Sequence, residues 1–179
     1  MTPVITYLGH STILINTENN KKIIIDPFID GSPVCPEEYK NFSDLDFILL
    51  THGHADHASS AAPLAKKTGA KVFATYELAM LLINKENVDA SQVHQCNKGG
   101  TVSLNNSTNL SVSFTNAFHS SSFDASDGNT YYAGEACGIV VTMESGKTIY
   151  HAGDTCLFKD MKLIQKKFKP SVALLPIGD

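Results

Sequence analysis

The chain has 179 residues, within the size range of one compact unit, so we expect a single domain over residues 1–179. Hydrophobic residues make up 42% and charged residues 18%, which is typical of a globular protein and excludes disordered or fibrous classes. The net charge of -4 argues against a nucleic-acid partner, and no apolar stretch is long enough to span a membrane. An N-terminus unlike a signal peptide and four scattered cysteines predict a cytoplasmic protein with free thiols.

The first half of the chain predicts an antiparallel start followed by alternating strands and helices. Short apolar runs separated by turns predict strands at residues 4–8, 13–16 and 23–25, joined as a meander. A strand buried on both faces is expected at residues 46–50, and another strand at 71–74. Helices are expected at residues 59–68, with Pro63 in the first turn and Gly69 as the stop, and at 76–84, with Thr75 as N-cap. This order indicates an α/β protein.

The second half predicts a return to antiparallel strands. Strands are expected at residues 93–96, 101–104 and 110–115, the last of them with strict alternation of apolar and polar residues. Residues 120–134 have no periodicity and are expected to form a long loop. A hairpin over 137–143 and 148–151 follows, then a helix over 158–168 with Met161, Leu163 and Ile164 turned inward. A last buried strand is expected at residues 172–176.

The most informative stretch is Thr-His-Gly-His-Ala-Asp-His-Ala at residues 51–58, directly after an apolar strand. It contains His52, His54, Asp56 and His57, whose imidazoles and carboxylate suit Zn²⁺, Mn²⁺ or Fe²⁺. Gly53 allows the tight turn that aims neighbouring side chains at one point. A solvated loop with surface histidines is the alternative, but four such residues at this density favour a loop that feeds two neighbouring metals.

Further candidates also follow strand ends. Asp26 ends an apolar strand before a proline, and a buried carboxylate there needs a partner, for which the His52 loop is available; a simple turn-capping role is equally open. His119 follows a strand as His52 does, so the two can converge. We leave His151 out of the ligands, because on a regular strand its side chain cannot point with Asp154.

The sequence resembles the metallo-β-lactamase superfamily through His52-x-His54-x-Asp56-His57 after an apolar strand. It is similar in particular to the uncharacterised metal-dependent hydrolases related to ascorbate-phosphate lactonase. The stretches that support this are Leu-Gly-His-Ser at residues 8–11, Ile-Asp-Pro-Phe at 25–28, Ala-Phe-His-Ser-Ser at 117–121, His-Ala-Gly-Asp-Thr at 151–155 and Leu-Pro-Ile-Gly-Asp at 175–179. The resemblance implies a four-layer αββα sandwich, with His10 at the active site, His119 as a metal ligand and Asp154 as a carboxylate that bridges two ions.

The pattern departs from the family at one point. Family members continue beyond the Pro-Ile-Gly segment and supply a further metal-binding histidine there, whereas this sequence has no histidine after His151. We therefore expect a truncated chain with its last helix and strand layer incomplete. Exposed apolar surface would then favour self-association into a homo-oligomer. The second metal would lack a ligand, so we expect a firmly bound first ion and a weak second one.

The predicted function is metal-dependent hydrolysis of a small ester, lactone or phosphorylated metabolite, most simply with Zn²⁺. Asp56 is the candidate to orient the water and take its proton, while His10 or a serine of the group at 120–122 could stabilise the oxyanion. Asp26, Ser120 and Ser121 are expected to support the ligands or substrate. The alternatives are a mononuclear iron dioxygenase held by His52, His119 and Asp154, or a non-catalytic metal-binding remnant. The acidic balance disfavours an RNA-processing nuclease.

Overall fold

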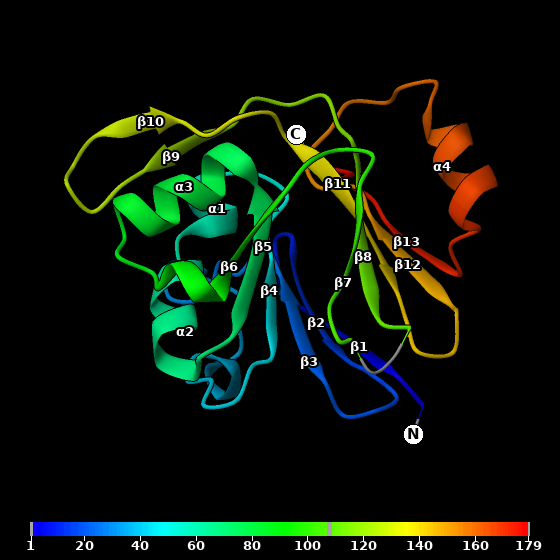
Figure 1. Ribbon diagram of the computed structural model, residues 1–179, viewed down its shortest axis with the longest axis horizontal. Coiled ribbons are helices and arrows are strands. Elements are labelled where there is room, and N and C mark those ends of the chain that lie inside the picture. Colours follow the sequence, from blue (N-terminus) through cyan, green and yellow to red (C-terminus); the bar gives the residue numbers. More distant parts are fainter. Residues whose placement is uncertain (1, 107–108, 179) are drawn as a thin grey trace.

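The computed structural model describes residues 2–106 and 109–178. Two β-sheets face each other, and helices lie on both outer sides (Figure 1). Helices α1 (Ala55–Ala58), α2 (Ala61–Thr68) and α3 (Tyr76–Asn84) cover the first sheet, and α4 (Met161–Phe168) lies outside the second. This is the predicted α/β, four-layer αββα sandwich, in which α4 is the one helix described in the fourth layer.

The first sheet brings the ends of several parallel strands to one edge. Its strands, in spatial order, are β1 (Val4–Gly9), β2 (Thr12–Asn16), β3 (Lys22–Ile25), β4 (Phe47–Leu49), β5 (Lys71–Thr75) and β6 (Val93–Cys96). The pairs β1–β2 and β2–β3 are antiparallel, which confirms the predicted meander, and β3 to β6 are parallel. Residues that follow β3 and β4 therefore share the carboxyl edge of the sheet.

In the second sheet, two strands end on the same side of the molecule as β3 and β4. Its spatial order is β13 (Val172–Leu174), β12 (Thr148–His151), β11 (Cys137–Thr142), β8 (Ser111–Asn116) and β7 (Thr101–Ser103). Both β8 and β12 are antiparallel to β11, so they run in the same direction and end at one edge. The loops after β8 and β12 therefore lie next to each other, although they are far apart in the sequence.

Three hydrophobic clusters separate the four layers. Successive residues of β4 point to opposite faces, so Ile48 packs toward the helices while Leu49 packs toward the second sheet. The third cluster lies between the second sheet and α4, where Ile164 is the buried helix residue. Pro63 is in the first turn of α2, and Gly69 ends that helix with a φ of 76°. Within the described ranges no helix has the length and apolar character needed to cross a membrane.

Three local expectations were wrong. Residues 120–134 are not an irregular loop but contain the hairpin of β9 (Ser122–Asp124) and β10 (Thr130–Tyr132); strands of three residues are too short to show periodicity. Strand β13 is not buried, since Val172 is 37% exposed. Of the three residues expected to point inward from α4, Ile164 is buried, whereas Leu163 is 61% exposed and Met161 is half-buried.

Candidate metal centre

The predicted site residues meet where the carboxyl ends of the two sheets come together. The backbone N–H of Cys137, at the start of β11, donates to the carbonyl oxygen of Thr51 at 3.0 Å and joins the sheets there. Four strands each supply one side chain from the loop that follows them: Asp26 after β3, His52 after β4, His119 after β8 and Asp154 after β12.

Three histidines form one group, which we call the three-histidine cluster: His52, His54 and His119. One ring nitrogen of each lies within 4.8 Å of the others. The closest pair is His52 Nε2 and His54 Nδ1, at 3.1 Å. His52 is fully buried and His54 half-buried, while His119 faces the surface. Three imidazoles converging from a buried floor to an open side are typical of a catalytic zinc site.

Hydrogen bonds on the far side of the rings determine which nitrogens are free. Thr51 Oγ1 lies 2.6 Å from a carboxylate oxygen of Asp26 and 3.0 Å from His52 Nδ1. The single hydroxyl proton goes to the carboxylate, so the hydroxyl oxygen accepts from Nδ1–H and His52 Nε2 keeps its lone pair. Ser120 Oγ lies 3.4 Å from His54 Nε2, where it can accept from Nε2–H and leave Nδ1 free in the same way. Both free nitrogens point into the cluster.

A second cluster lies beside the first and consists of His10, His57 and Asp154. His57 Nε2 is 3.3 Å from Asp154 Oδ2 and 3.2 Å from His10 Nε2. Asp154 Oδ2 is also 3.8 Å from His119 Nε2, so this carboxylate lies between the two clusters. Asp56 is at the outer rim, with its side chain 48% exposed and its Oδ2 3.0 Å from His10 Nε2.

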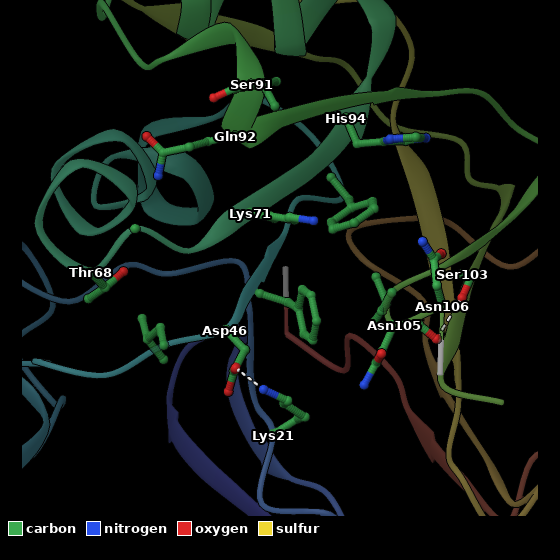
Figure 2. A pocket seen from close by; sticks show the side chains of 16 residues that line it. Lys21, Asp46, Thr68, Lys71, Ser91, Gln92, His94, Ser103, Asn105 and Asn106 are labelled. Carbon is green, nitrogen blue, oxygen red and sulfur yellow. Dashed lines mark hydrogen bonds and ion pairs between the residues drawn. The ribbon is translucent and has the colours of Figure 1, made fainter. Parts of the chain in front are cut away.

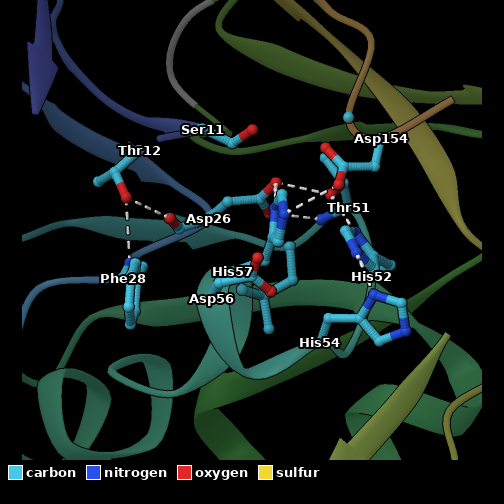
Figure 3. A network of polar contacts seen from close by, with 12 residues as sticks. Ser11, Thr12, Asp26, Phe28, Thr51, His52, His54, Asp56, His57 and Asp154 are labelled. Carbon is cyan, nitrogen blue, oxygen red and sulfur yellow. Dashed lines mark hydrogen bonds and ion pairs between the residues drawn. The ribbon is translucent and has the colours of Figure 1, made fainter. Parts of the chain in front are cut away.

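Asp26 supports both clusters from the buried side, through its contacts with Thr51 and His57 (Figure 3). It is fully buried and accepts three hydrogen bonds, from Thr51 N at 2.8 Å, from Thr51 Oγ1 and from His57 Nδ1 at 2.9 Å. Asp26, His52 and His57 could themselves be read as a metal-binding group. Both carboxylate oxygens of Asp26 already accept hydrogen bonds, however, so the role of this residue is to orient the histidine rings.

The electrostatics of the site favour a bound cation. Burial lowers the pKa of His52 to about 4, and the nearby His57 acts in the same direction. Burial opposes the charged form of His57, but hydrogen bonds with Asp154 and Asp26 raise its pKa to about 10. The hydrogen bond from His57 in turn holds the pKa of Asp154 well below its usual value. In the protein alone, a proton on His57 Nε2 therefore lies between this ring and Asp154, at a place that a metal ion could take.

The donor atoms fit a divalent metal in type and spacing. Zinc bonds of about 2.0–2.1 Å hold neighbouring ligand atoms about 3.0–3.4 Å apart. The nitrogen pair within the three-histidine cluster is 3.1 Å apart, and the contacts of His57 within the second cluster are 3.2 and 3.3 Å long. Imidazole nitrogens with one carboxylate between them suit Zn²⁺ and its first-row neighbours better than Mg²⁺ or Ca²⁺.

Some supporting residues were not identified from the sequence. Thr51 is the main one; its place immediately before His52 was the signal that could have drawn attention to it. His151 is buried, its Nε2–H donates to Ser11 O at 2.9 Å, and its Nδ1 accepts from Gly153 N at 3.1 Å. Both of its nitrogens are occupied, in agreement with its exclusion from the ligands. It ties the turn next to His10 to the turn next to Asp154.

The two serines differ in position. Ser121 is buried and its Oγ accepts from Gly53 N at 3.2 Å, so it fastens the β9 end of the hairpin to the histidine loop. Ser120 is exposed beside His54. Of the two, Ser120 is therefore the one that can meet a substrate, and Ser121 holds the loop in shape.

A groove of about 700 Å³ opens beside the clusters. His10, His119 and Asp154 line its polar side, and Tyr7, Phe118 and Ile177 are among its apolar residues. A hollow of about 790 Å³ lies elsewhere, at the amino ends of β4 and β5 (Figure 2). Its described lining includes the Lys21–Asp46 ion pair at 2.7 Å and no member of either cluster, so the groove is the candidate substrate site.

Comparisons with known proteins agree with this geometry. Residues 21–179 match the beta-lactamase superfamily domain. A UPF0173 metal-dependent hydrolase of Rubrobacter xylanophilus is 47% identical over 175 residues, which cover 98% of this chain and 70% of that protein.

Two solved structures are also similar. Igni18, a metallo hydrolase from Ignicoccus hospitalis, has a TM-score of 0.82 and 36% identity, covering 99% of this chain and 72% of that one. An isothiocyanate hydrolase from Delia radicum gut bacteria has a TM-score of 0.73 and 25% identity, covering 97% of this chain and 71% of that one. The fold, the two clusters of metal-binding side chains and these relatives agree: the chain belongs to the metal-dependent hydrolases of the metallo-β-lactamase superfamily.

Proposed function

We propose that the protein is a binuclear enzyme that hydrolyses a small ester, lactone or phosphorylated metabolite, with Zn²⁺ as the preferred metal. The observation that carries this is the pair of adjoining clusters, with Asp154 within reach of both His57 and His119. When bound, two such ions supply a water of lowered pKa and polarise the scissile carbonyl or phosphoryl group. His52, His54 and His119 would hold one ion, and His57, Asp56 and Asp154 are the predicted ligands of the other.

The remaining side chains suit the proton transfers of hydrolysis. Asp56 is half exposed at the rim of the second cluster, where its carboxylate can orient a water and accept its proton. Ser120, exposed beside His54, carries a hydroxyl that can donate to a developing oxyanion. His10 can also donate from the mouth of the groove. None of these steps needs a covalent intermediate with the protein.

The groove supports a substrate with both a polar and an apolar part. Tyr7, Phe118 and Ile177 are exposed on its apolar side by 66%, 55% and 97%, so a hydrocarbon group bound there would be removed from water. A small isothiocyanate is a second candidate, because the similar structure from Delia radicum gut bacteria is an isothiocyanate hydrolase. Attack of water on an electrophilic carbon or phosphorus atom is common to all of these substrates.

The test is removal and return of the metal, followed by a substrate panel. The protein is stripped with a chelator, reloaded with Zn²⁺, Mn²⁺ or Fe²⁺, and assayed with aryl esters, lactones, phosphodiesters and isothiocyanates. We expect activity that is lost with chelator, restored by metal and abolished in His52→Ala. The matched control is His94→Ala, since His94 is exposed on β6 and lines the other hollow. Activity in His52→Ala equal to that of the control would refute the proposal.

A further inference from the structure

We propose that Thr155 is a positioning residue of the metal centre, whose hydroxyl sets the separation between Asp154 and His119. This rests on the proposed binuclear function, since Asp154 is the carboxylate that lies between the two clusters. Thr155 is the last residue of the His-Ala-Gly-Asp-Thr stretch at residues 151–155 and takes no part in the proposed proton transfers. It is half-buried and lines the groove directly after Asp154.

Two hydrogen bonds join the loop that carries Asp154 to the loop that carries His119. The backbone N–H of Phe118 donates to Thr155 Oγ1 at 2.9 Å, across 37 positions of the sequence. The backbone N–H of Cys156 donates in return to the carbonyl oxygen of Phe118 at 3.3 Å. Phe118 and Thr155 are the immediate neighbours of the two metal-binding residues, so a shift at this contact would move His119 relative to Asp154.

The hydroxyl of Thr155 determines the direction of its hydrogen bonds. Its proton goes to the carbonyl oxygen of Cys156, 2.9 Å away, which leaves a lone pair of Oγ1 for the N–H of Phe118. Valine has nearly the same shape but neither donates nor accepts, whereas serine keeps both functions. Substitutions at this position therefore separate the effect of the hydroxyl from the effect of side-chain volume.

His119 depends on this contact more than the neighbouring histidines do. The others have a hydrogen-bond partner on the far side of the ring, namely Thr51 for His52, Ser120 for His54 and Asp26 for His57. The ring of His119 has no such partner in the described part of the chain, where its Nε2 lies 3.8 Å from Asp154 Oδ2. Its position is therefore set by its backbone, which Thr155 holds through Phe118.

The backbone on the other side of Asp154 is held independently of this contact. Gly153 has a φ of 63°, and a methyl group there would lie 2.8 Å from the backbone oxygen of Cys137 and 2.8 Å from Cβ of Thr51. This close packing fixes the turn against the sheets. Loss of the Thr155 hydroxyl should therefore loosen the place of Asp154 relative to the three-histidine cluster while the turn before it stays in position.

The first experiment is zinc titration of the metal-free protein, which needs no enzymatic activity. Wild type, Thr155→Val, Thr155→Ser and the control Thr148→Val are titrated by equilibrium dialysis. Thr148 Oγ1 also donates to a backbone oxygen, that of Phe168 at 2.9 Å, but this bond joins β12 to the end of α4. Zinc affinity should fall about 10–100-fold in Thr155→Val, as for residues that orient ligands, and stay near wild type in the other two variants. Unchanged affinity in Thr155→Val, or an equal loss in either other variant, would overturn the proposal.

A second experiment tests the hydrogen bond itself. Hydrogen exchange of the backbone amide of Phe118 is followed by NMR in the metal-free wild type and the two Thr155 variants. We expect exchange about 10-fold faster in Thr155→Val and near the wild-type rate in Thr155→Ser. Equal rates in Thr155→Val and wild type would also overturn the proposal. The proposed function fails separately: zinc binding as expected without hydrolysis of any panel substrate refutes that function and leaves the role of Thr155 in place.

Discussion

The hydroxyl of Thr51 provides the sharpest test of how the centre is organised. Thr51→Val removes a group that donates to Asp26 at 2.6 Å and lies 3.0 Å from His52 Nδ1, while keeping the side-chain shape. The buried ring then loses the acceptor that selects its tautomer. Two lost hydrogen bonds, one of them to a carboxylate, should lower the free energy of unfolding of the metal-free protein by about 2–4 kcal/mol. Affinity for the first zinc ion should fall about 10–100-fold.

Thr12→Val is the matched control for this change. Thr12 Oγ1 also makes two hydrogen bonds, donating to the backbone oxygen of Asp26 at 2.7 Å and accepting from Phe28 N at 3.1 Å, and neither partner is a histidine (Figure 3). Urea unfolding should show losses of similar size in both variants, and zinc titration should show weaker binding only in Thr51→Val. If both variants bind zinc as wild type does, Thr51 does not orient His52 and the argument fails.

Three further outcomes are expected. Without metal, thermal stability should peak near pH 6.5. Above this pH the stabilisation from protonated His57 is lost as the pH rises toward its folded-state pKa of about 10. Below it the unfolded state gains stability by protonating His52, which burial keeps neutral in the folded protein until the pH approaches its pKa of about 4. Unfolding scans with chelator measure this, and His57→Gln should lack the decline above the peak. Gly53→Ala should cost about 1–3 kcal/mol in urea unfolding, because a methyl group there would lie 2.6 Å from a backbone oxygen of β9. Finally, Leu163 and Ile177 are 61% and 97% exposed, so sedimentation velocity should detect self-association that serine at both positions reduces; a monomer at every concentration would contradict this.

The elements that the sequence predicts well have strong local signals. Helix α3 has the predicted bounds, residues 76–84, because a clear apolar face follows a residue that favours extended backbone. Thr75 occupies the N-cap position, yet its side chain makes no capping hydrogen bond, so only half of that prediction was right. The β9–β10 hairpin was missed because its order comes from tertiary contacts: Phe123 and Ala133 pack into the core beneath it.

The candidate site was predictable for a different reason. Parallel strands end at one edge, so Asp26 and His52 could be expected to meet before any distance was known. The contact between His10 and His57 spans 47 positions and depends on how the first hairpin curls over the sheet. Likewise, the direction of the two hydrogen bonds made by the Thr51 hydroxyl follows from the atoms on either side of it, Asp26 Oδ2 and His52 Nδ1, which the sequence does not reveal. Motif spacing identifies donors but does not determine how they pair.

The turn at His10 shows how stability and metal binding can be separated. Positive φ values outside glycine occur at Asn20 and Asn87, where the residue type tolerates them, and also at His10 and Asp26 within the centre. If His10 is kept for its ring, His10→Asn should leave the unfolding free energy of the metal-free protein unchanged or slightly higher. The affinity for the second metal ion should then fall. If His10 is kept for the turn, stability should fall and zinc affinity should not. Parallel denaturation and zinc titration of this one variant decide between them.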